Sequence, residues 1–337
     1  MPNSIAVLIL NYNGKVHLGV CLSSVLDQIE PNDEVYLVDN GSIDGSVQYV
    51  EEQYPEVKVI KFETNLGFAL AYNKAVALVP QEIVLFLNND VEVDRDWLAQ
   101  LRMALQRSPG GIAICGSKIL LYDNRHIVNH AGGVLTVIGG GIDLDFMKND
   151  EETAREAQFA GCVSGASMIV SRQVFLALGG FDPDFFAYFE DVDLCWRAWL
   201  AGYMVQFIPS SRVYHKLSST MGPHLTPERI FLGQKNRLQA MVKNLELWNA
   251  LVGLFASGIY TTIRLTRLLC VGKHTAALAI LRGDWWFLLH LRSIITKRAQ
   301  IQQGRKISDD FLLERGLMVR LVHGVKEFAR LNRLRGA

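Results

Sequence analysis

The chain has 337 residues, half of them hydrophobic, which is enough for one large α/β domain and an additional region. The formal net charge of zero conceals an uneven distribution: residues 1–211 hold 13 Lys+Arg and 27 Asp+Glu, whereas residues 212–337 hold 21 Lys+Arg and 7 Asp+Glu. The five cysteines are widely spaced and form no Cys-x-x-Cys pair, which argues against a disulfide framework or a zinc knuckle and favours a reducing, cytoplasmic compartment.

Short apolar runs alternate with segments of helical spacing over the first two thirds of the chain. The N-terminal MPNSIAVLIL has no basic region before its apolar run, so we expect a strand there and no signal peptide. Strands alternating with helices predict βαβ units and a mostly parallel sheet, with ligands bound beyond the carboxyl ends of the strands. The expected strands are Ile5–Leu10, Glu34–Val38, Val57–Phe62, Glu82–Leu87, Ile112–Cys115, Ser167–Val170 and Val205–Ile208; the expected helices between the first four are Val16–Asp27, Ser46–Tyr54 and Ala69–Leu78; glycines 132, 133 and 139–141 predict a loop or hairpin.

Polar residues follow several of these strands. Asp39 lies at the tip of the second strand, where its carboxylate can accept hydrogen bonds from a base or ribose, and Asn11 and Asn89 follow the first and fourth strands. Gly67, just before a helix that carries Asn73, would let the backbone approach a bound phosphate or sugar. Taken alone, the residues at Asp39 more commonly form an ordinary strand-to-helix turn, and those at Gly67 an ordinary helix start, so these alternatives stay open.

Asp90 and His215 are the candidates for a metal site. Asp90 follows a buried strand, and a hard divalent cation such as Mg²⁺ or Mn²⁺ commonly bridges protein carboxylates and phosphate oxygens. The stronger form of this signal is Asp-x-Asp, whose first position is Asn88 here. His215 also follows a strand, and Ser218 belongs to a hydroxyl cluster suited to phosphate contact. A turn at Asp90 and a structural histidine are the alternatives.

The segment from Gly179 to Arg197, GGFDPDFFAYFEDVDLCWR, places five acidic residues among large aromatic side chains. Carboxylates are costly to bury unless they are paired or used, and burial can raise the pKa of a carboxylate so that it acts as a general base. The alternative is a helix N-terminus decorated with acids, which favour the positive end of the helix dipole.

The amino-acid composition changes from about Glu246. Leu247–Ile263 is almost free of charge but lies near the lower limit of length for crossing a bilayer. Ala276–Leu291 is apolar but carries charges at its middle, and near the end Met318, Leu321, Val322, Val325 and Phe328 share one helical face flanked by basic residues. Such basic amphipathic helices suit an anionic membrane interface; a spanning helix, or a subdomain packed on the sheet or on another subunit, are the alternatives.

Taken together, the motifs resemble those of the family 2 glycosyltransferases, and within that family those of bacterial rhamnosyltransferase-like enzymes of surface polysaccharide assembly. The resemblance covers roughly Ile5 to Thr220. It is carried by NYNG, VDNGSIDGS, NLGFALAYN, LNNDVEV, SGASMIVSRQVFLALGGFDPDFFAYFEDVDLCWRA and VYHKLSST, in this order.

This resemblance implies a GT-A fold, a nucleotide-diphosphate sugar donor, a divalent metal and inversion at the anomeric carbon. It implies that Asp39 contacts the nucleotide, that Asp90 and His215 hold the metal on the donor diphosphate, and that Asp191 is the catalytic base. Glu190 would position the acceptor. The departure is Asn88-Asn89-Asp90 in place of a fuller acidic triplet, which bears on the ligand set of the metal. The resemblance also implies that Gly67 and Asn73 line the donor pocket, and we expect Asn11, Asn89 and Ser218 to belong to the substrate site as well.

The sequence therefore predicts a metal-dependent inverting glycosyltransferase with a catalytic domain over residues 1–245 and a basic helical region over residues 246–337. We expect a peripheral protein on the cytoplasmic face of the membrane, with dTDP-rhamnose suggested as donor and a glycan or lipid-linked acceptor. Homo-oligomers are possible, and we expect no nucleic-acid partner because the basic residues are interleaved with long apolar faces. The rivals are a non-catalytic sugar-nucleotide-binding assembly protein and a nucleotidyltransferase, although no Gly-rich triphosphate loop follows the first strand.

Overall fold

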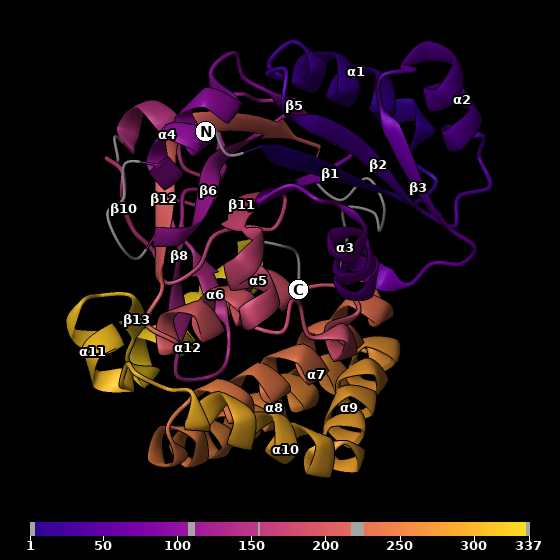
Figure 1. Ribbon diagram of the computed structural model, residues 1–337. Helices are drawn as coiled ribbons and strands as arrows, with labels where there is room; N and C mark the ends of the chain where they lie inside the picture. Colours follow the sequence, from indigo (N-terminus) through magenta and orange to yellow (C-terminus); the bar gives the residue numbers. More distant parts are fainter. Residues whose placement is uncertain (1–3, 107–111, 154–155, 217–225, 335–337) are drawn as a thin grey trace.

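The protein is described by a computed structural model, which covers residues 4–106, 112–153, 156–216 and 226–334. A mixed sheet lies at its centre, with helices on both faces and a helical layer beneath one of them (Figure 1). The order along the sheet is β10-β12-β6-β11-β4-β1-β2-β3, with β5 beside β12 and β7 beside β6. Its strands are β1 (Ile5–Asn11), β2 (Glu34–Asn40), β3 (Lys58–Phe62), β4 (Ile83–Asn88), β5 (Val91–Val93), β6 (Ile112–Leu121), β7 (Val128–His130), β10 (Gln158–Phe159), β11 (Ser167–Ser171) and β12 (Met204–His215).

Side-chain alternation along β1 explains the two apolar cores. Ile5, Val7 and Ile9 point to one face of the sheet, while Ala6 and Leu8 point to the other. The first face is covered by α1 (Lys15–Leu26), α2 (Ser46–Gln53) and α4 (Trp97–Gln106); the second is covered by α3 (Gly67–Leu78), α5 (Arg172–Ala177) and α6 (Glu190–Leu200). The predicted βαβ order of the first four strands and three helices is confirmed.

The sheet is less parallel than the sequence predicts. β1, β2, β3 and β4 pair in parallel, and so do β6 and β12, but β11 inserts antiparallel between β4 and β6. The short strands β5, β7 and β10 also pair antiparallel. Apolar runs predict burial and not strand direction, which is why β11 was not distinguished from its neighbours.

A three-stranded sheet, in the order β13-β8-β9, contains the hairpin predicted from the glycines. It is formed by β8 (Gly133–Thr136), β9 (Gly141–Asp143) and β13 (Met318–Val319). The expectation that Met318 belongs to the terminal helical face is wrong. Met318 is buried and pairs in a strand with Leu135, and the helix α12 (Leu321–Leu334) begins only after it.

The C-terminal layer is built around α7. Most of this helix is buried, because it lies between the sheet domain and the helices α8, α9 and α10. The sheet's apolar core continues into the layer through Ala250, Phe287, Ile294 and Leu312. Within the described residues, every helix lacks either the length or the apolar character needed to cross a bilayer. The layer comprises α7 (Pro227–Asn244), α8 (Leu247–Cys270), α9 (His274–Leu289), α10 (Leu291–Gln303) and α11 (Asp309–Glu314); two short 3-10 turns elsewhere are η1 (Asp150–Glu152) and η2 (Pro183–Phe185).

Candidate active site

The carboxyl ends of β1, β2 and β4 are joined by a chain of polar side chains. The Nδ2 of Asn11 donates to Oδ1 of Asp39 at 3.2 Å, and the Nδ2 of Asn89 donates to Oδ1 of Asn11 at 2.7 Å. Ser42 closes the chain on the β2 side, since its backbone N–H donates to Oδ2 of Asp39 at 3.1 Å. The structure thus brings Asp39, Asn11 and Asn89 together, as expected for residues at one edge of a parallel sheet.

Gly14 marks a place where this edge is tightly packed. A Cβ at Gly14 would lie 2.0 Å from Nδ2 of Asn89 and 2.7 Å from Oδ1 of Asn11, so a larger residue would displace both amides. Asn13 and Ser42, neither of them predicted as a site residue, connect the loops that follow β1 and β2. Asn13 donates from its backbone N–H to Oγ of Ser42 at 2.9 Å and accepts from the N–H of Ile43 at 2.8 Å.

Asp90 and His215 meet because β5 pairs with the end of β12. Val91 lies opposite His215 in that register, and Nε2 of His215 is 3.1 Å from Oδ1 of Asp90. The backbone N–H of Lys216 donates to the carbonyl of Asp90 at 3.0 Å. The side chain of Asn88 completes the group, with its Nδ2 3.4 Å from Nε2 of His215.

These groups fit a divalent cation as part of a larger ligand set. A carboxylate and an imidazole suit Mn²⁺ or Mg²⁺, and such ions usually take their remaining ligands from water and substrate phosphate. The described residues hold no cluster of three or more His, Cys, Asp or Glu side chains that would bind a metal unaided. The Nδ1 of His215 is buried without a hydrogen-bond partner among them. Within the described part of the chain, Asp90 and His215 could therefore supply two ligands to such a cation, and water or substrate oxygens would have to supply the others.

Gly67 lies where the start of α3 packs against the segment from Gly179 to Arg197, which we call the acid-rich segment. It has a φ of +77°, and a Cβ here would lie 2.5 Å from the ring of Phe186. The next residue, Phe68, donates its N–H to the carbonyl of Phe186 at 2.6 Å. Asn73 makes a second connection, donating to the carbonyl of Phe181 at 2.7 Å and accepting from its N–H at 2.9 Å. Both polar groups of Asn73 are thereby used to hold this segment.

Asp191 lies at the start of α6 and is held by main-chain donors. Its Oδ2 accepts from the N–H of Gly165 at 2.8 Å, and its Oδ1 accepts from the N–H of Val192 at 2.8 Å. Burial raises the pKa of Asp191, and the two N–H donors offset only part of that effect. The neighbouring Glu190 is buried, its Oε2 has no partner among the described residues, and burial together with the charge of Asp191 raises its pKa well above the usual value.

Asp90 and Asp191 lie at the same edge of the sheet. The N–H of Asn88, two residues before Asp90, donates to the carbonyl of Ala166 at 3.1 Å, and the adjacent Gly165 holds Asp191. This arrangement follows from the antiparallel pairing of β11 with β4, which places the start of β11 beside the end of β4. Ser218 lies outside the described residues.

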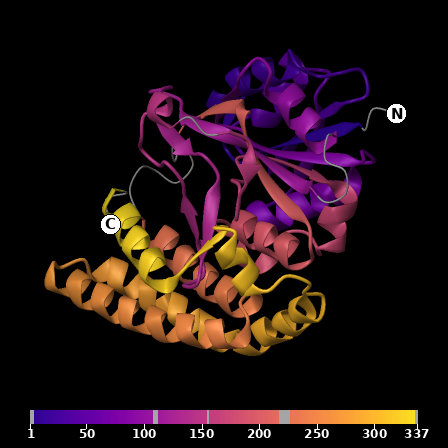
Figure 2. The same ribbon diagram turned by 90° about the vertical axis from the view of Figure 1, so that its left-hand side faces the viewer.

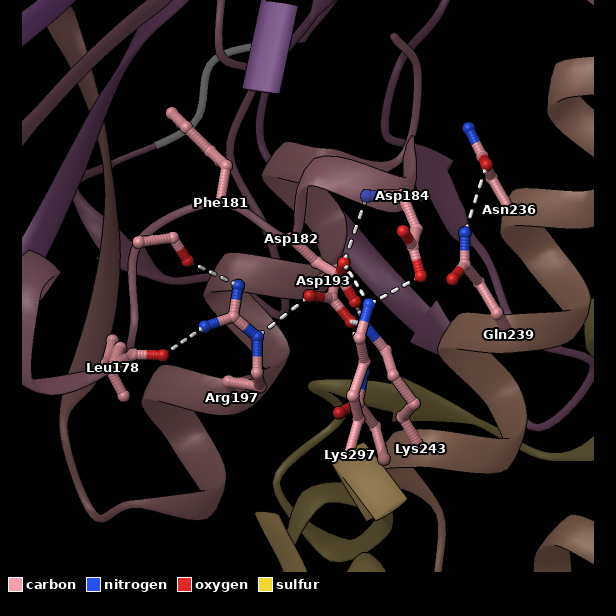
Figure 3. A network of polar contacts seen from close by, with 12 residues as sticks. Leu178, Phe181, Asp182, Asp184, Asp193, Arg197, Asn236, Gln239, Lys243 and Lys297 are labelled. Carbon is pink, nitrogen blue, oxygen red and sulfur yellow. Dashed lines mark hydrogen bonds and ion pairs between the residues drawn. The ribbon is translucent and has the colours of Figure 1, made fainter. Parts of the chain in front are cut away.

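The other acids of the same segment are neutralised by cations, as Figure 3 shows. Lys243 of α7 lies 2.5 Å from Asp182 and 3.1 Å from Asp193. Lys297 of α10 lies 2.6 Å from both Asp182 and Asp184, and Arg197 bonds Asp193 at 2.8 Å. Burial alone would raise the pKa values of Asp182 and Asp193, but the cations lower both below their usual value.

The backbone just before Glu190 is unusual and is held by α7. Phe186, Tyr188 and Phe189 have φ angles of 63°, 69° and 72°, a left-handed region that non-glycine residues rarely adopt. The Nδ2 of Asn236 donates to the carbonyls of Phe185, Ala187 and Tyr188 at 3.0, 2.8 and 2.7 Å. Strained backbone that its surroundings hold in place is common at functional sites, so Asn236 is a support that the sequence reasoning did not identify.

Comparison with known proteins identifies the family of this chain. The family model described as "Glycosyl transferase family 2" matches residues 6–178, just over half of the chain. The chain belongs to glycosyl transferase family 2. The matched region contains Asp90 and the hydrogen-bonded side chains of Asp39, Asn11 and Asn89. Glu190, Asp191 and Asp193 of α6 lie beyond it.

Relatives and solved structures extend the comparison. The chain is 29% identical over 243 residues to the N-acetylglucosaminyl-diphospho-decaprenol L-rhamnosyltransferase of Mycobacterium tuberculosis, which covers 65% of this chain and 78% of the relative. It is 31% identical to the uncharacterized protein y4gI of Sinorhizobium fredii over 59% of this chain, and spans only 23% of that protein's length. GalNAc-T7, solved with UDP, GalNAc and Mn²⁺, superposes with a TM-score of 0.59 at 18% identity, over 72% of this chain and 48% of that one. The predicted GT-A type of fold is thereby confirmed.

Proposed function

We propose that this protein is an inverting, metal-dependent glycosyltransferase that moves a sugar from a nucleotide-diphosphate donor to a hydroxyl of a glycan acceptor. The observation that carries the proposal is the different treatment of two carboxylates at one sheet edge. Asp90 is paired with the imidazole of His215, while Asp191 is held by backbone N–H groups and has a raised pKa. One carboxylate is arranged to share a cation and the other to accept a proton.

In the proposed reaction, Asp191 takes the proton from the acceptor hydroxyl as its oxygen attacks the anomeric carbon. The bond from that carbon to the diphosphate breaks, and the electron pair leaves with the diphosphate. Asp90 and His215 would hold Mg²⁺ or Mn²⁺, which when bound stabilises the charge of the leaving group. Glu190, buried beside the base, would position the acceptor, and its raised pKa favours a protonated form that can donate a hydrogen bond.

The donor would lie along the polar chain at the ends of β1, β2 and β4. Asp39 would accept hydrogen bonds from the nucleotide, with Asn11 and Asn89 fixing its orientation. Gly67 and Ser218 would line the same site, and Asn73 would contribute by holding the segment at Phe181. The name of the M. tuberculosis rhamnosyltransferase supports rhamnose as the sugar and a lipid-linked acceptor. The motif resemblance suggests dTDP-rhamnose as the donor and surface polysaccharide synthesis as the process. The Mn²⁺ bound to GalNAc-T7 supports a divalent metal.

Peripheral attachment to an anionic membrane surface on the cytoplasmic side is part of the proposal. The inner sides of α8, α9 and α10 face the rest of the protein, and their outer sides carry exposed large apolar residues; we call this surface the outer face. The helices that carry it form the base of the molecule in Figure 2, on the side away from the sheet. Its residues are Leu247, Trp248, Leu251, Phe255, Ile259, Ile263, Leu278, Leu281, Trp285, Leu288, Leu289, Leu291 and Ile295.

The charges of these helices complement anionic lipid. Arg267, Lys273, Arg282 and Arg292 are exposed, whereas the one acidic residue between 247 and 303, Asp284, bonds to Gln234 of α7 at 2.6 Å. Exposed tryptophan and phenylalanine with basic residues are typical of helices that lie in a membrane interface. The division into a catalytic domain over residues 1–245 and a basic helical region over residues 246–337 belongs to this proposal.

The test is release of nucleoside diphosphate from a panel of nucleotide sugars by the full chain, with Mn²⁺ or Mg²⁺ and polyprenyl-diphosphate-linked sugar as acceptor. We expect release that requires the metal and the acceptor, with the new bond of inverted configuration. Donor binding without release under every condition would favour the non-catalytic assembly protein. Pyrophosphate release from a sugar phosphate and a nucleoside triphosphate would instead favour the nucleotidyltransferase.

A further inference from the structure

The turn before Glu190 displays an aromatic side chain that the function proposed above does not use. Phe186 is 40% exposed, whereas its neighbours Phe181 and Phe185 are fully buried. Single exposed apolar residues are common on protein surfaces, so exposure by itself explains nothing. The backbone of Phe186 is unusual, however, with a φ of 63° and a ψ of −63°. A bulky residue rarely adopts a positive φ, and strain of this kind is retained chiefly at functional sites.

Neighbouring elements hold this strained turn in place. The carbonyl of Phe186 accepts a hydrogen bond from the N–H of Phe68, in the first turn of α3, at 2.6 Å. The carbonyls on either side of it, those of Phe185 and Ala187, accept from Nδ2 of Asn236 on α7 at 3.0 and 2.8 Å. Asn236 is fully buried. The turn is therefore formed before any ligand binds, and a ligand does not have to order it.

Contacts link the ring of Phe186 to the nucleotide end of the site. A Cβ added to Gly67 would lie 2.5 Å from Cδ2 of this ring, so the missing side chain of Gly67 makes room for the phenylalanine. The carbonyl of Gly67 in turn accepts from Nδ2 of Asn40 at 3.2 Å. Asn40 is the last residue of β2 and follows Asp39 directly. The ring therefore lies beside the strand end that carries Asp39.

A second set of contacts links the same turn to the base. The ring of Phe68, whose N–H binds the carbonyl of Phe186, reaches toward Gly165. A Cβ added to Gly165 would lie 3.0 Å from Cζ of Phe68 and 3.4 Å from Cβ of Asp191. The N–H of Gly165 also donates to Asp191 at 2.8 Å. Phe186 is thus packed at the junction of the nucleotide end and the base, where the two sugars have to meet.

We propose that Phe186 is a binding platform for the pyranose ring of one of the two sugar substrates. A pyranose presents C–H groups on its faces, and these pack on an aromatic ring with a gain in dispersion and a loss of apolar surface from water. The donor sugar and the terminal sugar of the acceptor share this chemistry, and both must lie close to Asp191 during transfer. The inference rests on the proposed function only in taking the substrates to be sugars.

The kinetic test compares Phe186→Leu with Phe186→Tyr in the full chain. Leucine keeps apolar volume over Gly67 but removes the flat ring, whereas tyrosine keeps the ring. We expect Phe186→Leu to raise the KM of one substrate about tenfold with little change in kcat, and Phe186→Tyr to keep the original KM. A higher donor KM assigns the platform to the donor sugar, and a higher acceptor KM assigns it to the acceptor sugar.

Phe159→Leu is the matched control, because Phe159 of β10 is similarly exposed, at 48%, on a strand at the far edge of the sheet. It should leave both KM values in place. Unchanged KM values in a folded Phe186→Leu, or an equal rise in Phe159→Leu, would overturn the inference.

A second measurement does not depend on turnover. Ring resonances of ¹³C-phenylalanine-labelled protein report binding at Phe186, whose signal is identified by its loss in Phe186→Tyr. The donor probes, with Mn²⁺, are dTDP-rhamnose and UDP-N-acetylglucosamine beside dTDP and UDP. The acceptor probe is polyprenyl-diphosphate-linked N-acetylglucosamine beside polyprenyl diphosphate.

We expect a sugar-bearing probe to shift the Phe186 resonance and its sugar-free counterpart to leave it unchanged. Equal shifts with and without the sugar, or no shift with any probe, would overturn the platform. Failure of the unsubstituted chain to transfer sugar overturns the proposed function instead, so the two failures are distinguishable.

Discussion

The five acids between Gly179 and Arg197 fall into two groups that the structure treats in opposite ways. Asp182, Asp184 and Asp193 are paired with Lys243, Lys297 and Arg197. Glu190 and Asp191 lie between them in the sequence and have no salt-bridge partner among the described residues. Burial raises the pKa values of this second group, while cations lower those of Asp182 and Asp193. Paired carboxylates stabilise a fold; unpaired ones are available for chemistry.

The cations of the first group come largely from the C-terminal layer. Lys297 of α10 reaches the acid-rich segment, and Arg298 donates to the carbonyls of Val242 and Leu245 at 2.5 and 2.6 Å, satisfying the end of α7. Removing the chain from Glu246 onward would therefore also loosen the segment that carries Asp191. Point variants on the outer face test membrane attachment without this effect.

Lys243→Met gives the largest expected stability change. It leaves Asp182 with Lys297 and Asp193 with Arg197, so we expect a loss of up to about 3–5 kcal/mol, the cost of breaking a buried ion pair whose remaining charge has no other partner. Chemical denaturation at pH 7 measures this loss. Lys58→Met is the matched control, because the Lys58–Glu34 pair lies at the surface, with side chains 56% and 32% exposed, and surface pairs contribute about 0–1 kcal/mol. Equal losses in the two variants would contradict the distinction between buried and exposed pairs.

Asp90→Asn tests the other half of the site. Replacing the carboxylate with an amide removes the charged metal ligand while preserving shape, so we expect the Mn²⁺ concentration for half-maximal turnover to rise about 100-fold, equivalent to about 2.7 kcal/mol. Asp94→Asn is the control, since Asp94 lies nearby and bonds the hydroxyl of Tyr214. A normal manganese requirement in Asp90→Asn would remove Asp90 from the metal site.

Phe255→Ser and Trp285→Ser test the outer face. Both residues are exposed, at 73% and 63%, and each that enters a lipid interface contributes at least about 1.5 kcal/mol, or roughly tenfold in partition. Sedimentation with liposomes containing anionic lipid measures the loss. Leu78→Ser, at an exposed leucine of α3, should bind like the unsubstituted chain. Concentration-dependent dimers in light scattering, with no liposome binding, would instead indicate that the outer face contacts a second copy.

Acid denaturation tests the paired acids through the pH dependence of stability. The folded-state pKa values of Asp182 and Asp193 lie below the unfolded value of about 3.9, so their contribution is complete above that pH and lost as the pH falls below it. As the pH is lowered from about 5, the free energy of unfolding should decrease by at most about 1.4 kcal/mol per pH unit for each carboxylate. Lys243→Met should flatten this dependence, and an unchanged slope would exclude the network as its source.

The sequence predicted the strand ends well, because alternating apolar runs locate β1, β2 and β4 and parallel strands bring their carboxyl ends together. It did not reveal that Lys243 and Lys297 meet Asp182, because these residues lie far apart in the chain. A lysine on an amphipathic helix is usually exposed, and nothing local marks Lys243 as buried.

The most direct test of the account is the turnover of Asp191→Asn beside that of Asp184→Asn at pH 7. Both variants remove one carboxylate from the same segment, one unpaired and one paired with Lys297. We predict that Asp191→Asn lowers kcat by about 10²–10⁴-fold while nucleotide-sugar binding, followed by thermal shift, is retained. Asp184→Asn should keep most of its turnover. Retained turnover in a folded Asp191→Asn would contradict the central claim that this carboxylate is the base.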